Sequence, residues 1–150
     1  MKKIDAKDRR ILHELKHDGR MSNVELAERV NLSPSTCLRR VQELERAGVI
    51  RGYRVVTDPE RLGHGFVAYV SVGLSLHSKA ALEDFENSMR QAEEVIECHN
   101  VAGTFEYLLR IESEDLASYK RFHSERLGTH PYVSAITTYL VMHSPKDERA

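Results

Sequence analysis

The spacing of apolar residues predicts helices in the first third of the chain. Asp5 is a suitable N-cap for the first of them, which we expect over residues 5–17. Ser22 is expected to cap the second, with Glu25 three residues later as in a capping box. The apolar residues that these two helices should bury are Ile11, Leu12, Leu15, Val24, Leu26, Ala27 and Val30.

A third helix is expected over residues 34–47. Ser33 supplies a hydroxyl cap, Pro34 occupies the first helical position, where no backbone N–H is needed, and Gly48 ends the helix. The turn Asn31-Leu32 before it is short, which is typical of the helix-turn-helix motif of DNA-binding proteins. The residues of this helix that should point inward are Cys37, Leu38, Val41 and Leu44.

The opposite side of the third helix carries the candidate DNA contacts. Hydroxyls at its N-terminal tip and two arginines one turn further on suit insertion into a major groove, because hydroxyls and helix N-terminal amides bind phosphate and arginine can contact guanine. On an arbitrary helix such arginines form a solvated face, but the cap, the short turn and the preceding helix favour DNA contact here. The residues of this motif that we predict to contact DNA are Ser22, Asn23, Ser33, Ser35, Thr36, Arg39 and Arg40.

A short extended segment, VIRGYRVV, follows Gly48 and ends at Thr57-Asp58-Pro59. From this segment Arg51 and Arg54 either contact the DNA backbone or act as edge-strand charges that discourage aggregation, and the sequence leaves both roles open. The proline and two glycines of the next nine residues indicate a linker. We therefore divide the chain into a helix-turn-helix domain with its trailing strand, a linker and a second domain, at 1–56, 57–65 and 66–150.

The second domain alternates strands and helices. Strands are expected over 66–76, 95–101, 105–112 and 133–142, and helices over 79–91 and 115–127. The order strand, helix, strand, strand, helix, strand is typical of a ferredoxin-like fold, a four-stranded sheet with its helices on one face, so the whole chain is predicted to be α+β. The two helices should bury Leu82, Phe85, Met89, Leu116, Tyr119 and Phe122.

The helix-free face of this sheet should be bare in a single chain, and a partner subunit is its expected cover. The residues expected on it, or next to it, are Tyr69, Val101, Tyr139 and Val141.

The charge changes sign along the chain. The 150 residues carry a net charge of −1, but residues 1–56 hold 13 Lys and Arg against 8 Asp and Glu, whereas residues 57–150 hold 9 against 15. This division places any contact with a polyanion in the first third. Cys37 and Cys98 form no CxxC pair, which is typical of a reducing compartment, and no apolar run is long enough for a signal peptide or a membrane span. We therefore expect a soluble cytoplasmic protein with no membrane partner.

No sequence motif predicts catalysis. The eight histidines lack the spacing of zinc ligands, and HExxH, GxSxG, Walker and dinucleotide-binding patterns do not occur. We expect no catalytic residue, no metal and no cofactor.

Two sets of residues carry a family resemblance. The first is Asp5, Asp8, Ile11-Leu12, Leu15, Gly19-Arg20, Leu26-Ala27, Leu32-Ser33-Pro34-Ser35, Arg39-Arg40, Leu44-Glu45, Gly48-Val49-Ile50 and Tyr53. The second is Val95-Ile96-Glu97-Cys98, the run from Val101 to Arg110, Val133 and Thr137-Thr138. Taken in this order, over nearly the whole chain, they resemble the Lrp/AsnC (feast/famine) transcriptional regulators.

The resemblance implies a helix-turn-helix domain hinged to a ferredoxin-like sensing domain, double-stranded operator DNA as a partner, and dimers that can assemble into octamers. It gives residues 51–56 a dimerisation role. It also implies an amino-acid effector in a cleft between sensing domains, near the glycine turn and the last strand. The effector-binding residues carried over from the family are Gly103, Thr104, Phe105, Glu106, Tyr107, Thr137 and Thr138.

Thr104 departs from the family pattern, because an acidic residue often follows the turn glycine there. A hydroxyl cannot meet the charge of an effector's ammonium group, which weakens the expectation of effector binding. Simpler roles also stay open, since Gly103 would suit a hairpin that needs positive φ and Glu106 would suit an exposed strand charge.

We predict a sequence-specific DNA-binding transcriptional regulator of amino-acid metabolism, whose effector binds at a subunit interface. A tetrapyrrole-modifying enzyme similar in fold to the sirohaem decarboxylase subunits is the alternative, and the basic face of the third helix disfavours it. A small-molecule-binding or assembly module without a role at genes is a third possibility.

Overall fold

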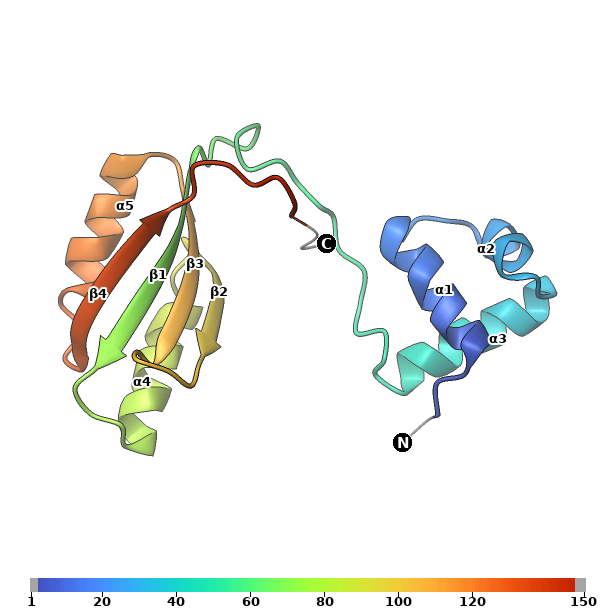
Figure 1. Ribbon diagram of the computed structural model, residues 1–150, viewed down its shortest axis with the longest axis horizontal. Coiled ribbons are helices and arrows are strands. Elements are labelled where there is room, and N and C mark those ends of the chain that lie inside the picture. The colour runs from blue at the N-terminus through green and yellow to red at the C-terminus, as the bar shows by residue number, and fades with distance from the viewer. Residues whose placement is uncertain (1–2, 148–150) are drawn as a thin grey trace. The chain divides into compact units, whose positions relative to one another are not determined.

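The computed structural model describes residues 3–147, which form two compact units (Figure 1). The division falls between Val56 and Thr57, so the segment predicted as a linker, 57–65, lies at the start of the second unit. Each unit has its own hydrophobic core. None of the helices in the described part of the chain has the length and apolar character that crossing a bilayer requires.

The first unit contains three helices, α1 (Ala6–His17), α2 (Asn23–Val30) and α3 (Pro34–Arg46). Each starts at a predicted N-cap, whose side chain accepts a hydrogen bond from the backbone N–H three residues later. At α1 the bond is reciprocal, because the Asp8 carboxylate also accepts from the Asp5 N–H. Gly48 follows α3 with a φ of 68°, a conformation that glycine adopts without strain.

The prediction that Val24 and Leu38 are buried was wrong, because both are exposed. On α3 the buried positions are Cys37 and Leu44, which lie seven residues apart and therefore on one side of the helix. Leu38 is rotated by about 100° from Cys37 and faces solvent. The core of this unit consists of Ile11, Met21, Leu26, Ala27, Val30, Cys37 and Leu44.

The second unit is a four-stranded antiparallel sheet with the predicted ferredoxin-like order of elements. Its strands are β1 (Phe66–Leu74), β2 (Val95–Asn100), β3 (Tyr107–Ser113) and β4 (Val133–Leu140), arranged as β2-β3-β1-β4. The helices α4 (Lys79–Arg90) and α5 (Leu116–Phe122) cover one face of the sheet, and α5 continues into a π-helical turn, η1 (His123–Leu127) (Figure 1). The α+β fold class is confirmed.

The predicted burial of Leu116 was wrong. Leu116, Tyr119 and Phe122 are spaced by three residues, and each such step falls about 60° short of a full turn. Leu116 is therefore about 120° from Phe122 around the helix and points away from the core that Tyr119 and Phe122 reach.

The sheet face opposite the helices is partly polar. Tyr69 pairs with Tyr139 across β1 and β4, and Tyr139 is exposed. On β3 the Arg110 side chain is buried, and it forms ion pairs with Glu112 and with Asp147 near the C-terminus. The predicted open face therefore contains a buried cation as well as the exposed Tyr139.

The pairing of β1 with β4 is irregular at its end. The register shifts between Gly73 and Leu74, so the strand ladder is interrupted there. The Leu74 N–H instead donates to a side chain, that of Glu106, which lies just before β3.

Candidate nucleic-acid interface and effector site

The angle between α2 and α3 is fixed by contacts within the first unit. Asn31 ends α2 in the left-handed conformation with a φ of 54°, which turns the chain toward Ser33. The Asn23 side-chain amide donates to the Pro34 carbonyl at 2.9 Å, which ties the start of α2 to the start of α3. Two predicted DNA-contacting residues, Asn23 and Ser33, therefore also hold the motif together.

Basic side chains of α1 cap the end of α2. Lys7 Nζ donates to the Val30 carbonyl at 2.9 Å, and Arg10 Nη2 donates to the Arg29 carbonyl at 2.8 Å. Cations at the carbonyl end of a helix are stabilised by its dipole. Lys7 and Arg10 thus have structural partners, although they add to the basic charge of this unit.

Arg39 lies on the exposed side of α3, as the sequence indicates. Its side chain is 61% exposed, and its Nη1 pairs with Glu43 Oε1 at 2.6 Å, one helical turn away. An exposed pair of this kind contributes at most about 1 kcal/mol. A phosphate or a guanine could therefore replace Glu43 as the partner of Arg39 at little cost.

Arg40 does not lie on the exposed face, which corrects the prediction for this residue. Its side chain is 22% exposed, and Nη1 donates to Asp5 Oδ2 at 2.7 Å and to Asp8 Oδ1 at 2.8 Å. The Asp8 side chain is 1% exposed. A backbone bond from Asp8 and then the Arg40 guanidinium hold the pKa of Asp5 below its usual range. Arg40 connects α3 to the start of α1.

The position of Arg40 follows from helix geometry. Arg40 comes three residues after Cys37 and four before Leu44, the two buried positions of α3, and so stands on their side of the helix. The residues that do face outward form a stripe that starts at Ser35. We call Ser35, Leu38, Arg39, Gln42 and Arg46, all exposed, the outer face of α3.

Gln42 and Arg46 are outer-face residues that the sequence analysis missed. They lie seven and eleven residues after Ser35, a spacing that returns to the same side of a helix. That spacing was readable in the sequence once Cys37 and Leu44 were fixed as the buried pair. Thr36, in contrast, is half-buried and accepts a hydrogen bond from the Ser33 hydroxyl at 2.8 Å.

The segment after α3 is exposed and forms no strand within the described chain. Arg51 and Arg54 are both exposed, as are Val55 and Val56. Tyr53 donates a hydrogen bond to Glu45 of α3 at 3.0 Å, which holds the start of the segment near that helix. Because apolar side chains are exposed to solvent here, the segment is suited to pairing with another chain.

Residues 101–106, which we call the sensing turn, connect β2 to β3. The turn is closed by the Val101 N–H, which donates to the Glu106 carbonyl at 2.9 Å, and by the Asn100 side chain, which donates to the same carbonyl at 3.2 Å. Gly103 and Thr104 at its tip are exposed. Gly103 does not have a positive φ, so the hairpin role left open for it does not apply, and a Cβ atom at this position would meet nothing within 4 Å. Nothing in the described chain requires glycine there.

Glu106 is not a free strand charge. Its Oε2 accepts from the Leu74 N–H at 2.7 Å, and its Oε1 lies 3.0 Å from His77 Nε2. The Leu74 N–H, and after it His77, hold the pKa of Glu106 below its usual range, so the carboxylate is ionised at neutral pH. The sensing turn is thereby connected to the end of β1.

Three of the predicted effector residues are divided between the two faces of the sheet. Tyr107 is 1% exposed and donates to Glu86 of α4 at 2.7 Å, so it belongs to the helix-covered side. Thr138 contacts the Tyr119 hydroxyl on that same side. Thr137 pairs with Ser71 across β1 and β4 and faces the other way, since neighbouring strand residues alternate. One cleft on one face of a single sheet cannot be lined by all three.

Comparison with known proteins covers both units. A family model described as winged helix-turn-helix DNA-binding matches residues 4–51, and one described as Lrp/AsnC ligand binding domain matches residues 67–150. The leucine-responsive regulatory proteins of Klebsiella pneumoniae and Escherichia coli (strain K12) are each 41% identical to the chain over 145 residues, which are 97% of this chain and 88% of either relative.

Solved structures agree with these matches. A transcriptional regulator from Neisseria meningitidis, crystallised as a complex with L-Met, is similar with a TM-score of 0.92 at 37% identity, over 97% of this chain and 94% of that chain. An AsnC family transcriptional regulator from Agrobacterium tumefaciens gives a TM-score of 0.89 at 30% identity, over 95% of this chain and 93% of that chain.

Proposed function

Because this chain belongs to the Lrp/AsnC family, we propose that it binds operator DNA through the outer face of α3 and changes its affinity for DNA when an amino acid occupies the sensing turn. The chain is a DNA-binding transcriptional regulator that senses amino acids, since both family domains and the leucine-responsive relatives agree on this. The observation that supports the DNA-binding surface is the exposure of Arg39 on a serine-capped helix.

The outer face of α3 offers the chemistry of direct base recognition. Arg39 suits the O6 and N7 acceptors of guanine, Gln42 suits the N6 and N7 groups of adenine, and Leu38 suits the methyl group of thymine. Ser35 and Arg46 lie at the two ends of the face, and together with Ser22, Asn23, Ser33 and Thr36 at the helix starts they are suited to phosphate contact. Arg40 acts indirectly, by holding α3 against α1.

The assembly would present two such helices to one face of the DNA. Pairing of the 51–56 segments from two chains would make a dimer, and Arg51 and Arg54 would then lie beside the DNA backbone. Further association into octamers would follow through the sensing domains. Half-sites would then lie one helical turn, or a multiple of it, apart.

The effector would be a small amino acid held at the sensing turn, between subunits. Backbone groups of Gly103, Thr104 and Phe105 are available there, and Glu106 and Thr137 stand on the sheet face away from the helices. The L-Met complex of the Neisseria protein and the leucine-responsive relatives support an amino acid with an apolar side chain. A cytoplasmic location, without a membrane partner or a cofactor, accords with this function.

A gel-shift titration with two arginine variants tests the assigned face. Arg39→Ala should weaken DNA binding about tenfold or more and lower its salt dependence, without lowering the melting temperature. Arg40→Ala should lower the melting temperature as well, because it leaves Asp8 buried without its partner. Unchanged affinity in Arg39→Ala would show that α3 is not the reading helix.

The tetrapyrrole-modifying alternative is not favoured, because the relatives and structures reported above are transcriptional regulators. The visible absorbance spectrum of the purified protein checks this point directly. A bound tetrapyrrole would give a strong absorption band, whereas we expect only the ultraviolet absorbance of the protein.

A further inference from the structure

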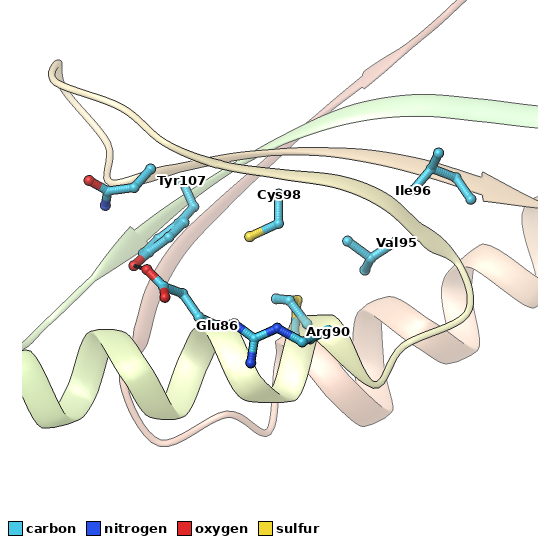
Figure 2. A pocket seen from close by; sticks show the side chains of 8 residues that line it. Glu86, Arg90, Val95, Ile96, Cys98 and Tyr107 are labelled. Atoms are coloured by element: carbon cyan, nitrogen blue, oxygen red, sulfur yellow. Dashed lines mark hydrogen bonds between the residues drawn. The ribbon is translucent and has the colours of Figure 1, made fainter. Parts of the chain in front are cut away.

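A cavity of about 310 Å³ lies under the helix-covered side of the sheet, between α4 and the edge strand β2 (Figure 2). Cys98 on β2 pairs with Leu109, a fully buried core residue, and therefore faces the helices, yet Cys98 itself is exposed. The cavity is open to solvent on one side, where Arg90, Ile96 and Asn100 are exposed as well. The cavity is at the lower end of the range of small-ligand sites and is lined by Glu86, Met89, Arg90, Val95, Ile96, Cys98, Asn100 and Tyr107.

Charges of opposite sign enter this cavity from one helix. Glu86 and Arg90 are four residues apart on α4, a spacing at which a glutamate and an arginine usually pair. In the described structure they do not pair. Glu86 accepts from the Tyr107 hydroxyl at 2.7 Å, and Arg90 donates to Asn87 on its own helix. The Glu86 carboxylate and the Arg90 guanidinium thus lie next to each other, and each can still form a hydrogen bond with a further partner.

The rest of the lining is apolar or neutral. Met89 forms part of the core beneath the cavity, and Val95 packs against that core from β2, with Ile96 at the rim (Figure 2). Although Cys98 is partly exposed, the protein atoms around its thiol desolvate it, and this desolvation, followed by the charge of Glu86, raises the pKa of the thiol to about 11. The thiol is therefore protonated at neutral pH, so the cavity is not a reactive-cysteine site.

We propose that this cavity binds the zwitterion of a second α-amino acid, separate from the effector at the sensing turn. Glu86 would accept from the ammonium group, Arg90 would bind the carboxylate, and the apolar lining would receive a side chain of the size of leucine or methionine. A ligand that carries both charges meets both side chains, whereas an amine or a carboxylic acid alone leaves one of them without its partner.

The cavity is joined to the sensing turn through backbone and side-chain contacts. Asn100 lines the cavity and donates to the Glu106 carbonyl that closes the turn. Tyr107, which also lines it, is the next residue after Glu106. A ligand in the cavity would therefore change the affinity of the sensing turn for its effector. By thermodynamic linkage, an effector at the turn would change the affinity of the cavity for its ligand by the same factor.

The two cysteines make a direct test possible. Cys98 stands in the cavity, whereas Cys37 is fully buried in the first unit and serves as an internal reference. The rate at which an aromatic disulfide reagent modifies Cys98 in the full-length protein is measured at about pH 9, where a fraction of the thiol is ionised and can react, with L-leucine or L-methionine added. At ten times the dissociation constant we expect the reaction to be about tenfold slower.

Matched variants identify the groups responsible. Glu86→Gln keeps an acceptor for the Tyr107 hydroxyl, and Arg90→Gln keeps a polar side chain, so both should fold, and both should lose the protection. Glu83→Gln on the same helix, outside the cavity lining, should retain it. L-Leucine analogues that lack either the carboxylate or the amine should protect at least tenfold less well.

Three outcomes would overturn the proposal. If an amino acid changes DNA binding but leaves the Cys98 rate unchanged, or protects Glu86→Gln and Arg90→Gln as well as the wild type, then the cavity is not its site and the proposed function stands. If Cys98 reacts as slowly as Cys37 without any amino acid, another subunit fills the cavity. Loss of DNA binding in the wild type would instead contradict the proposed function alone.

Discussion

The outer face of α3 and the tip of the sensing turn are both exposed, but the chain holds them in different ways. Around α3 the support is internal, since Arg40 reaches two aspartates of α1 and Asn23 ties the start of α3 to α2. At the sensing turn the tip residues Gly103 and Thr104 are exposed, and a Cβ atom added at Gly103 would meet nothing within 4 Å. The outer face of α3 is therefore supported by contacts within one chain, whereas the tip of the sensing turn is exposed in the described chain.

The largest expected loss of stability comes from breaking the ion pair that connects α3 to α1. Asp8→Ala should destabilise the first unit by roughly 3 kcal/mol, the lower end of the range for breaking a buried pair, because Arg40 stays partly solvated. Urea unfolding monitored by circular dichroism measures the change. As a control, Glu25→Ala removes only an exposed pair with Arg29 and should cost less than about 1 kcal/mol. Equal losses in the two variants would show that the Arg40 pair is not a support.

A smaller effect is expected at the base of the sensing turn. The folded-state pKa of Glu106 lies below its unfolded value, so its stabilisation is complete above the unfolded pKa and is lost as the pH falls through the folded one. The difference in stability between wild type and Glu106→Gln should therefore shrink as the pH is lowered from about 6 to about 3. Urea midpoints at several pH values measure it. A difference that does not change with pH would mean that Glu106 contributes no charge-dependent stability.

The smallest effect on folding is expected at the tip of the turn. Gly103→Ala should change the free energy of unfolding by no more than about 0.5 kcal/mol, because the backbone there does not need positive φ and a Cβ atom has room. It should nevertheless weaken the response of DNA binding to an amino acid, since the added methyl group stands where a ligand or a second subunit would approach. Gel shifts with and without L-leucine measure the response to the amino acid, and a melting curve measures the stability of the same variant. A response equal to that of the wild type would remove Gly103 from the effector site.

The sequence predicted most of the local structure because the relevant signals are local. Asp5, Ser22 and Ser33 cap their helices as expected, and the alternation along β1 gave the correct buried face. The errors lie where a residue's direction depends on contacts distant in sequence. Arg40 was placed outside because its two aspartate partners lie more than thirty residues earlier.

The candidate site was harder to predict than the fold. Thr137 and Thr138 were both carried over from the family resemblance, although strand alternation alone sends them to opposite faces. The cavity beside Cys98 had no sequence signal, because it arises from how α4 and β2 fit together. Only the sequence spacing of Glu86 and Arg90 could have indicated it, and that spacing is common on helix surfaces.

The register shift at the end of β1 gives a single amide an unusual sensitivity. The Leu74 N–H donates to one carboxylate oxygen of Glu106, which lies just before the start of β3. If a bound ammonium group draws this carboxylate away, the Leu74 amide loses its acceptor and is left to bind water or to have no partner. Its protection against hydrogen exchange then falls. One backbone proton at the margin of the sheet would then report occupancy before any larger rearrangement of the protein.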